Sequence, residues 1–307
     1  MLAAYFSHPS MRQHEMGPGH PECPERLSAV QDRLLGSGLL DYMHDVTARP
    51  ATREQIARVH DTLYIDELFA HSPAEGRHNL DPDTSMNPHT LEAALLAAGA
   101  AIEATDWVIQ GQTQRAFCNV RPPGHHAERH QAMGFCFFNN VCAAMAHALE
   151  HHGLERVALI DFDVHHGNGS EDIFAGDDRV LMCSIFQTNF YPWSGEVPKG
   201  PNMVNVGLPE RSRGEQFREA VTTRWLPALH AFRPQMLFIS AGFDAHLEDD
   251  MGNLGLVEAD YAWVTDRLGE VADQHAQGRI VSCLEGGYDL SSLARSACAH
   301  VKSLMGL

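Results

Sequence analysis

The chain has 307 residues, 44% of them hydrophobic, and its 40 acidic against 22 basic side chains give a formal net charge of −18. This acidity argues against non-specific binding to nucleic acid or to anionic membranes, because both need basic patches. No apolar run of about 18 residues is present, so we expect no transmembrane span. The seven cysteines include no C-x-x-C pair, which favours reduced thiols and a cytoplasmic protein.

Strand-like apolar runs alternate with helical patterns along almost the whole chain. The expected strands cover residues 3–7, 115–120, 157–162, 180–185, 236–240 and 279–284. The expected helices cover residues 88–110, 137–151, 214–231 and 258–277, the first with Asn87 as N-cap, Pro88 at its first position and Gly111 as C-cap. Strand–helix alternation predicts a parallel sheet covered by helices on both faces. With no repeat and no flexible linker, we expect a single α/β domain over residues 1–307.

Polar segments follow four of these strands at the point where each strand ends. They cover residues 121–127, 161–169, 240–246 and 284–289 and are rich in glycine, histidine and aspartate. Ligand sites of parallel sheets lie beyond the carboxyl ends of the strands. We therefore expect these four segments to meet in one site.

Three residues of these segments could bind a metal ion. Asp163 and His165 stand two positions apart at the end of an apolar strand, so their side chains point to the same side. Asp244 follows another strand of the same sheet. Two carboxylates and one imidazole leave an open position for water or substrate, as in catalytic zinc sites, although the same ligands also accept Fe²⁺. We predict one divalent cation here.

The remaining polar residues supply groups that a metal hydrolase needs. The tandem His125-His126, held by Pro122-Pro123, can provide a general base. Each imidazole needs a partner that fixes its tautomer, and Asp161 and Asn168 are the candidates. Tyr288, after two glycines, can donate a hydrogen bond to an oxyanion.

At these residues the chain resembles the zinc-dependent histone deacetylase and acetylpolyamine amidohydrolase superfamily, and its class II members most closely. The motifs that carry the resemblance are RPPGHHA, GFCFFNN, DFDVHHGNG, SAGFDAH and EGGYD. The resemblance implies an arginase-like α/β fold with an eight-stranded parallel sheet. It also implies an amidohydrolase that removes acetyl or other acyl groups from lysine side chains by attack of a metal-activated water.

The family pattern implies a role for each motif residue. Asp163, His165 and Asp244 would hold one Zn²⁺, with Tyr288 as the transition-state donor. His126 would be the main base with Asn168 as its partner, and His125 would pair with Asp161. A structural K⁺ would bind backbone carbonyls near Asp161, Asp163, His165 and Ser184. The implied substrate-binding residues are Phe135 and Tyr191 as tunnel walls, with Gly134, Gly287, Met251 and the rim residue Asp83, while Arg26 would line an internal acetate channel.

The substrate is the main point that the sequence leaves open. Polyamine-selective relatives carry a glutamate where Met251 aligns, so Met251 favours acyl-lysine peptides or proteins, with acetylated polyamines or other small amines as the alternative. Tyr288 argues against a non-catalytic acyl-lysine reader. A binuclear manganese ureohydrolase would need further carboxylates near Gly167 and His246. The acyl length and the oligomeric state, a homo-oligomer included, are not determined by the sequence.

Overall fold

Eight parallel strands form the central sheet of the computed structural model, which describes residues 3–307. Their order across the sheet is β2-β1-β5-β10-β9-β6-β7-β8, and β3 and β4 form a separate antiparallel pair. The strands are β1 (Ala3–Ser7), β2 (Met43–Thr47), β3 (His78–Asn79), β4 (Ser85–Met86), β5 (Arg115–Cys118), β6 (Val157–Asp161), β7 (Val180–Gln187), β8 (Met203–Leu208), β9 (Leu237–Ala241) and β10 (Ile280–Leu284). The expected α/β fold with an eight-stranded parallel sheet is confirmed.

The sequence predicts the six inner strands and misses the two outer ones. Inner strands such as β6, β9 and β10 are buried along their whole length, and burial on both faces produces the continuous apolar runs that mark them. The edge strands β2 and β8 are only partly buried. Their sequences mix polar and apolar residues, so no apolar run reveals them.

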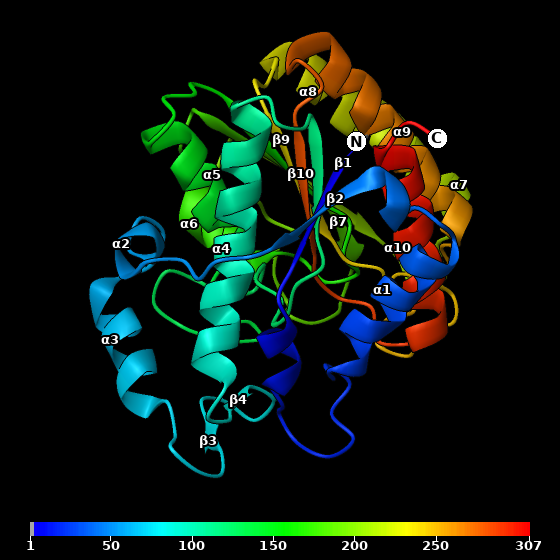
Figure 1. The fold of residues 1–307 in the computed structure, drawn as a ribbon. Coiled ribbons are helices and arrows are strands. Elements are labelled where there is room, and N and C mark those ends of the chain that lie inside the picture. The colour runs from blue at the N-terminus through cyan, green and yellow to red at the C-terminus, as the bar shows by residue number, and fades with distance from the viewer. Residues whose placement is uncertain (1–2) are drawn as a thin grey trace.

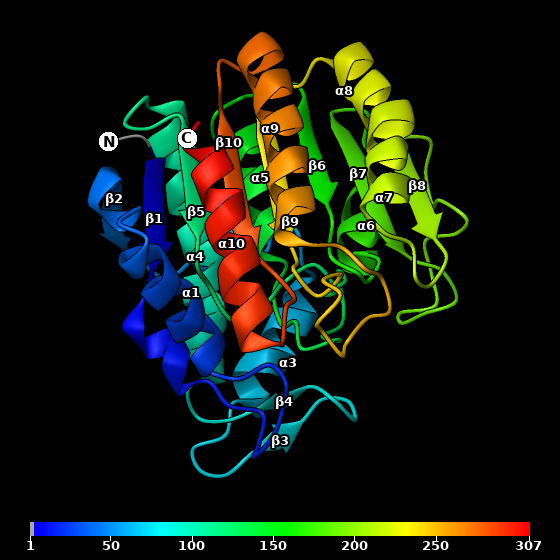
Figure 2. The same ribbon diagram turned by 90° about the vertical axis from the view of Figure 1, so that its right-hand side faces the viewer.

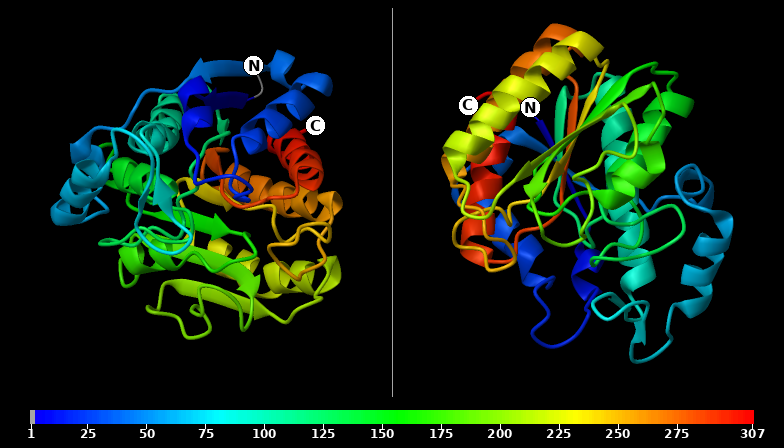
Figure 3. Two further views of the ribbon diagram at one scale, coloured as in Figure 1. Left: turned by 90° about the horizontal axis from the view of Figure 1, so that it is seen from below. Right: turned by 180° about the vertical axis from the view of Figure 1, so that it is seen from behind.

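Helices cover both faces of the sheet (Figures 1 and 2). On one face lie α4 (Thr90–Ile109), α5 (Asn140–Glu150) and α6 (Asn168–Phe174), with α2 (Arg53–Ile56) and α3 (Thr62–His71) beside them. On the other lie α1 (Glu25–Gly36), α7 (Gly214–Ala220), α8 (Leu226–Phe232), α9 (Glu258–His275) and α10 (Leu290–Leu304). Short 3-10 helices cover Pro9–Gln13 and Leu40–Tyr42, and a π-helical turn, Val221–Trp225, joins α7 to α8. Seen from below in Figure 3 (left), the two helical layers flank the sheet.

The predicted start of α4 is wrong by two residues. His89 is the N-cap, and the helix begins at Thr90. Asn87 instead accepts hydrogen bonds from the His89 N–H and the Thr90 hydroxyl, so it shapes the turn before the helix. Pro88 lies in that turn. The C-cap is Gln110 rather than the expected Gly111, which comes next with a φ of +76°, as is common for the glycine that follows a C-cap.

The loops after the strands gather beyond the arrowheads, at the lower edge of the sheet in Figure 2. This edge carries the four polar segments singled out from the sequence, because every strand of the large sheet points the same way. Within residues 3–307, none of the helices combines the length and apolar character needed to cross a membrane.

Candidate active site

Asp163, His165 and Asp244 converge at the carboxyl edge of the sheet, and all three are buried. Nδ1 of His165 lies 3.0 Å from Oδ1 of Asp163 and 3.2 Å from Oδ2 of Asp244. Asp163 and His165 follow β6, and Asp244 follows β9, the neighbouring strand. One ligand atom from each residue therefore lies within 4.8 Å of the other two.

Two buried carboxylates this close together need a positive charge between them. Burial and the charge of Asp163 raise the pKa of Asp244 to about 7. Burial alone lowers the pKa of His165, but the nearby carboxylates of Asp163 and Asp244 outweigh it and raise the pKa to about 9. Oδ2 of Asp244 is buried without a hydrogen-bond partner. An orphaned oxygen beside a carboxylate and an imidazole fits a divalent cation, whose charge would offset the repulsion.

Glycines make room for this group of ligands. A Cβ on Gly286 would lie 2.0 Å from Oδ2 of Asp244 and 2.5 Å from Oδ2 of Asp163. A Cβ on Gly242 would lie 2.1 Å from Oδ2 of Asp163. The Gly286 N–H also donates to Asp163 Oδ2 at 2.8 Å. The glycines therefore let the backbone pack directly against the carboxylates.

The two tandem histidines lie beside these ligands, with ring centroids 4.0 Å apart. Nδ1 of His125 is 3.0 Å from Asp161 Oδ2, and Nδ1 of His126 is 2.7 Å from Asn168 Oδ1. Burial alone lowers the pKa of His125, but the charges of Asp163 and Asp161 outweigh it and raise the pKa well above its usual value. Burial and the neighbouring imidazoles lower the pKa of His126 well below its usual value. The two rings therefore favour opposite protonation states.

The loop that carries Tyr288 is held on two sides. Arg26, fully buried, donates from Nε to the Gly287 carbonyl at 2.6 Å and from Nη2 to the Glu285 carbonyl. Its guanidinium carbon lies 4.9 Å from the centroid of the Tyr288 ring. On the other side, the buried Asp249 carboxylate accepts from the N–H of Tyr288 at 2.6 Å, of Asp289 at 2.9 Å and of Met251 at 3.0 Å.

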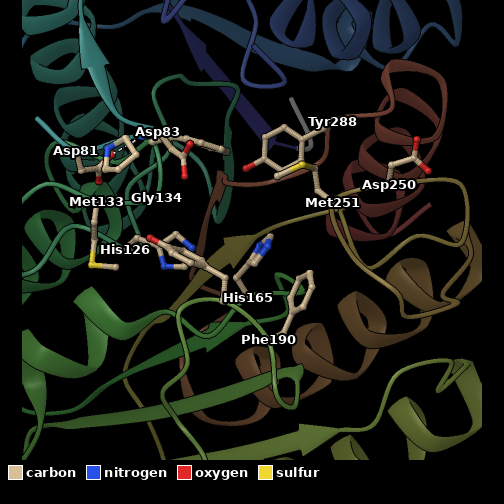
Figure 4. A pocket seen from close by; sticks show the side chains of 13 residues that line it. Asp81, Asp83, His126, Met133, Gly134, His165, Phe190, Asp250, Met251 and Tyr288 are labelled. Atoms are coloured by element: carbon tan, nitrogen blue, oxygen red, sulfur yellow. Dashed lines mark hydrogen bonds between the residues drawn. The ribbon is translucent and has the colours of Figure 1, made fainter. Parts of the chain in front are cut away.

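A cavity of about 470 Å³ leads from the surface to these groups. His126, His165 and Tyr288 reach into it in Figure 4. The expected wall residues Phe135 and Tyr191 line it, together with Gly134, Met251 and the exposed rim residue Asp83. Its other lining residues are Asp81, Pro82, Met133, Phe190 and Asp250. The pocket is thus lined by one predicted metal ligand, His165, by one predicted base, His126, and by the predicted tunnel residues.

Close approach around Gly134 shapes this pocket. Gly134 has a φ of +56°, and a Cβ there would lie 2.5 Å from the His126 ring. Gly287, also expected to bind substrate, is not among the residues that line this pocket. Its φ of +116° lies in a region that favours glycine. The expected K⁺ site stays a prediction; Asp161 and Ser184 are paired in register between β6 and β7.

Three residues of the site are not predicted from the sequence: the partly buried Phe190 and the buried Glu285 and Asp249. The Phe190 ring stacks on His165, with centroids 5.4 Å apart. Glu285 accepts from the N–H groups of Gly124 and His125 at 2.6 and 3.1 Å, which fixes the backbone before His126. Asp249 fixes the Tyr288 loop as described above. The position of Phe190 next to Tyr191 in the sequence could have indicated it. Glu285 and Asp249 bind backbone N–H groups, which are the same in every residue type except proline, so the sequence does not indicate their partners.

Comparison with known proteins agrees with this site. The histone deacetylase domain family matches residues 20–304. The histone deacetylase-like amidohydrolase of Pseudomonas aeruginosa is 37% identical over 94% of this chain and 78% of its own length. The human polyamine deacetylase HDAC10 is 35% identical over 100% of this chain and 48% of its own. A crystal structure of the HDA15 HD domain superposes with a TM-score of 0.91 at 32% identity, covering 99% of this chain and 89% of that one. The chain therefore belongs to the histone deacetylase family and is a hydrolytic deacetylase.

Proposed function

We propose that this enzyme is a Zn²⁺-dependent deacylase of lysine side chains, with Asp163, His165 and Asp244 as the metal ligands. The observation that carries the proposal is the convergence of these three side chains, one of which, His165, lines the same pocket as His126 and Tyr288. A bound zinc ion supplies a Lewis acid that polarises the amide carbonyl and makes a water molecule more acidic. The two carboxylates match its double positive charge.

His126 has the features of the general base. Asn168 Nδ2 donates to Glu128 Oε1 at 2.8 Å, so Asn168 Oδ1 faces His126 as an acceptor. Nδ1 of His126 therefore carries the proton, and Nε2 presents a lone pair. The depressed pKa of His126 keeps this ring neutral. It can take a proton from the attacking water and pass it to the leaving amine.

His125 and Tyr288 stabilise negative charge in the site, whereas His126 accepts the proton of the water. Asp161 Oδ2 lies 3.0 Å from Nδ1 of His125, and Asp163 Oδ2 lies 3.7 Å from its Nε2; both carboxylates favour the protonated form of this ring. Burial raises the pKa of the Tyr288 phenol well above 10, so it remains a donor. A hydrogen bond from this phenol to the substrate oxygen strengthens as that oxygen gains negative charge.

The lining of the pocket bears on the choice of substrate. Phe135, Tyr191 and the apolar Met251 suit the methylene chain of an acylated lysine. Asp83 and Asp250, both exposed at the pocket mouth, favour a substrate with additional positive charge. An acetylated polyamine is therefore the second candidate, and the human relative named above is a polyamine deacetylase.

Turnover of a substrate panel with metal analysis tests the proposal. The panel contains acetyl-lysine peptides, trifluoroacetyl-lysine peptides and acetylated polyamines. We expect one zinc at this site and fastest turnover of an acyl-lysine peptide; preference for a polyamine would favour the second candidate. Asp244→Ala should lose both the bound metal and turnover, whereas Asp250→Ala, the matched control, should keep the metal. Zinc binding at this site by the Asp244→Ala variant, shown by zinc-dependent turnover, would contradict the assigned ligands.

The setting of the enzyme is part of the proposal. All seven cysteines are free thiols, which supports a reducing, cytoplasmic compartment. A homo-oligomer remains a prediction.

A further inference from the structure

A second group of metal-ligating side chains lies far from the pocket, where α4 and α5 end. His147 belongs to the last turn of α5, and His151 and His152 follow that helix directly. Asp106 belongs to the last turn of α4, which packs beside α5 (Figure 1). We call these four residues the α5 histidine cluster. Helix α5 starts near the active site and rises for about 16 Å, so the cluster lies at the opposite edge of the sheet.

The three histidines already converge, and Asp106 contacts two of them. One ring nitrogen from each histidine lies within 4.8 Å of the other two. His147 and His151, one helical turn apart, stack with ring centroids 4.6 Å apart and planes 14° apart. Oδ1 of Asp106 lies 2.7 Å from Nε2 of His147 and 2.6 Å from Nε2 of His152. Three imidazole nitrogens and one carboxylate oxygen are a complete tetrahedral ligand set for a borderline divalent ion.

The polypeptide around the cluster favours a cation. Asp106 Oδ1 contacts Nε2 of both His147 and His152, so a carboxylate oxygen already faces two of the other ligands. Both α4 and α5 point their C-terminal ends here, and the carbonyl groups of a helix C-terminus attract positive charge. His147 is buried and His152 half-buried, which holds two of the ligands in place, while the exposed His151 can rotate toward them.

Arg58 opposes this binding and offers a way to test it. Its Nη1 lies 2.9 Å from Nδ1 of His147 and donates to it, so the proton of that imidazole stands on Nε2, facing Asp106. Coordination through Nε2 requires the proton to move to Nδ1, and Arg58 must then turn away. Glu150 Oε2, 3.6 Å from Arg58 Nε, can receive it.

We propose that the α5 histidine cluster is a second binding site for a divalent transition-metal ion of the Zn²⁺, Ni²⁺ or Cu²⁺ class, separate from the active site. The hydrogen bonds around Asp106 hold the ligands together without the ion. Binding replaces these hydrogen bonds by four coordinate bonds.

Zinc titration of chelator-stripped protein tests the proposal. Stoichiometry is measured by calorimetry and by metal analysis after equilibrium dialysis. The variant His151→Ala/His152→Ala should bind one zinc fewer per chain than the unmodified protein. The matched control is His230→Ala/His275→Ala, which removes another surface pair, with Nδ1 and Nε2 3.0 Å apart; it should bind as much zinc as the unmodified protein. Arg58→Gln should bind the second zinc more tightly, because it removes the competing cation.

The outcomes separate this proposal from the one on the active site. An unchanged stoichiometry in His151→Ala/His152→Ala, or an equal loss in the control, would overturn the second site. Deacetylase turnover at saturating zinc should be the same in both variants, since neither touches the pocket. If the active site failed to bind zinc, the His151→Ala/His152→Ala variant should still bind one zinc ion fewer per chain than the His230→Ala/His275→Ala control. Circular dichroism checks that each variant is folded. The Co²⁺ absorption spectrum of the unmodified protein should contain a tetrahedral component from the α5 histidine cluster, in addition to that of the active site. The His151→Ala/His152→Ala variant should lack this additional component.

Discussion

The clearest untested link in the site is the one between Asp249 and Tyr288. The carboxylate of Asp249 accepts three backbone N–H groups, two from the tyrosine loop and one from Met251 at the pocket mouth. It therefore ties the proposed oxyanion donor to the rim of the pocket. Asp249→Asn removes the charge and replaces one acceptor oxygen by a donor, with almost no change in size.

The structure sets the size of the expected effect. One amide oxygen can still accept from Tyr288 and Asp289, so at least one charge-assisted hydrogen bond is lost and one N–H then faces the new NH₂ group. We expect a loss of about 1.5–3 kcal/mol in the free energy of unfolding. Turnover should fall by about tenfold or more, up to the roughly 10²–10³-fold expected when an oxyanion donor is removed.

A double-mutant cycle shows whether Asp249 acts through Tyr288. We would measure kcat and KM for Asp249→Asn, for Tyr288→Phe and for the double variant on one acyl-lysine peptide. If Asp249 acts by positioning the phenol of Tyr288, Asp249→Asn should lower kcat strongly in the unmodified enzyme but only slightly in the Tyr288→Phe variant, which has no hydroxyl to position. Asp250→Asn, the control, makes the same charge change on an exposed neighbour; because Asp250 lines the pocket mouth, we expect any effect in KM and a nearly unchanged kcat. An equal loss of kcat with and without the Tyr288 hydroxyl would refute the positioning role.

Further substitutions address the other assigned roles. Tyr288→Phe alone should slow turnover by roughly 10²–10³-fold with the metal retained; near-normal rates would leave Tyr288 a packing role only. His126→Ala should reduce kcat more than His125→Ala, because the neutral ring is the proposed base, and steady-state kinetics giving the reverse order would exchange the two roles. Met251→Glu should raise kcat/KM for acetylated polyamines, and an unchanged value would remove this position from substrate selection. Chelation should abolish turnover and added Zn²⁺ should restore it, so activity that survived metal removal would contradict metal catalysis.

The parts of the fold that the sequence predicts are those where burial is complete. Inner strands such as Val157–Asp161 read as unbroken apolar runs because helices cover both of their faces. The edge strand Met203–Leu208 is only partly buried, and its mixed sequence carries no such signal. The helix Leu290–Leu304 also goes unpredicted, although Asp289 caps it and it packs on α1 and α9.

The residues of the site likewise fall into two groups: those that the sequence predicts and those that only the structure reveals. The difference lies in what each residue binds. The convergence of Asp163, His165 and Asp244 can be predicted from the sequence because few side-chain types bind metals, and because the strands before them end at one edge of the sheet. Asp249 and Glu285 bind backbone N–H groups of distant loops. A backbone N–H is present at every residue except proline, so nothing in the partner segment indicates which carboxylate it meets. Positioning groups of this kind become visible only when the chain is folded, and for that reason the double-mutant cycle at Asp249 tests information that only the three-dimensional structure contains.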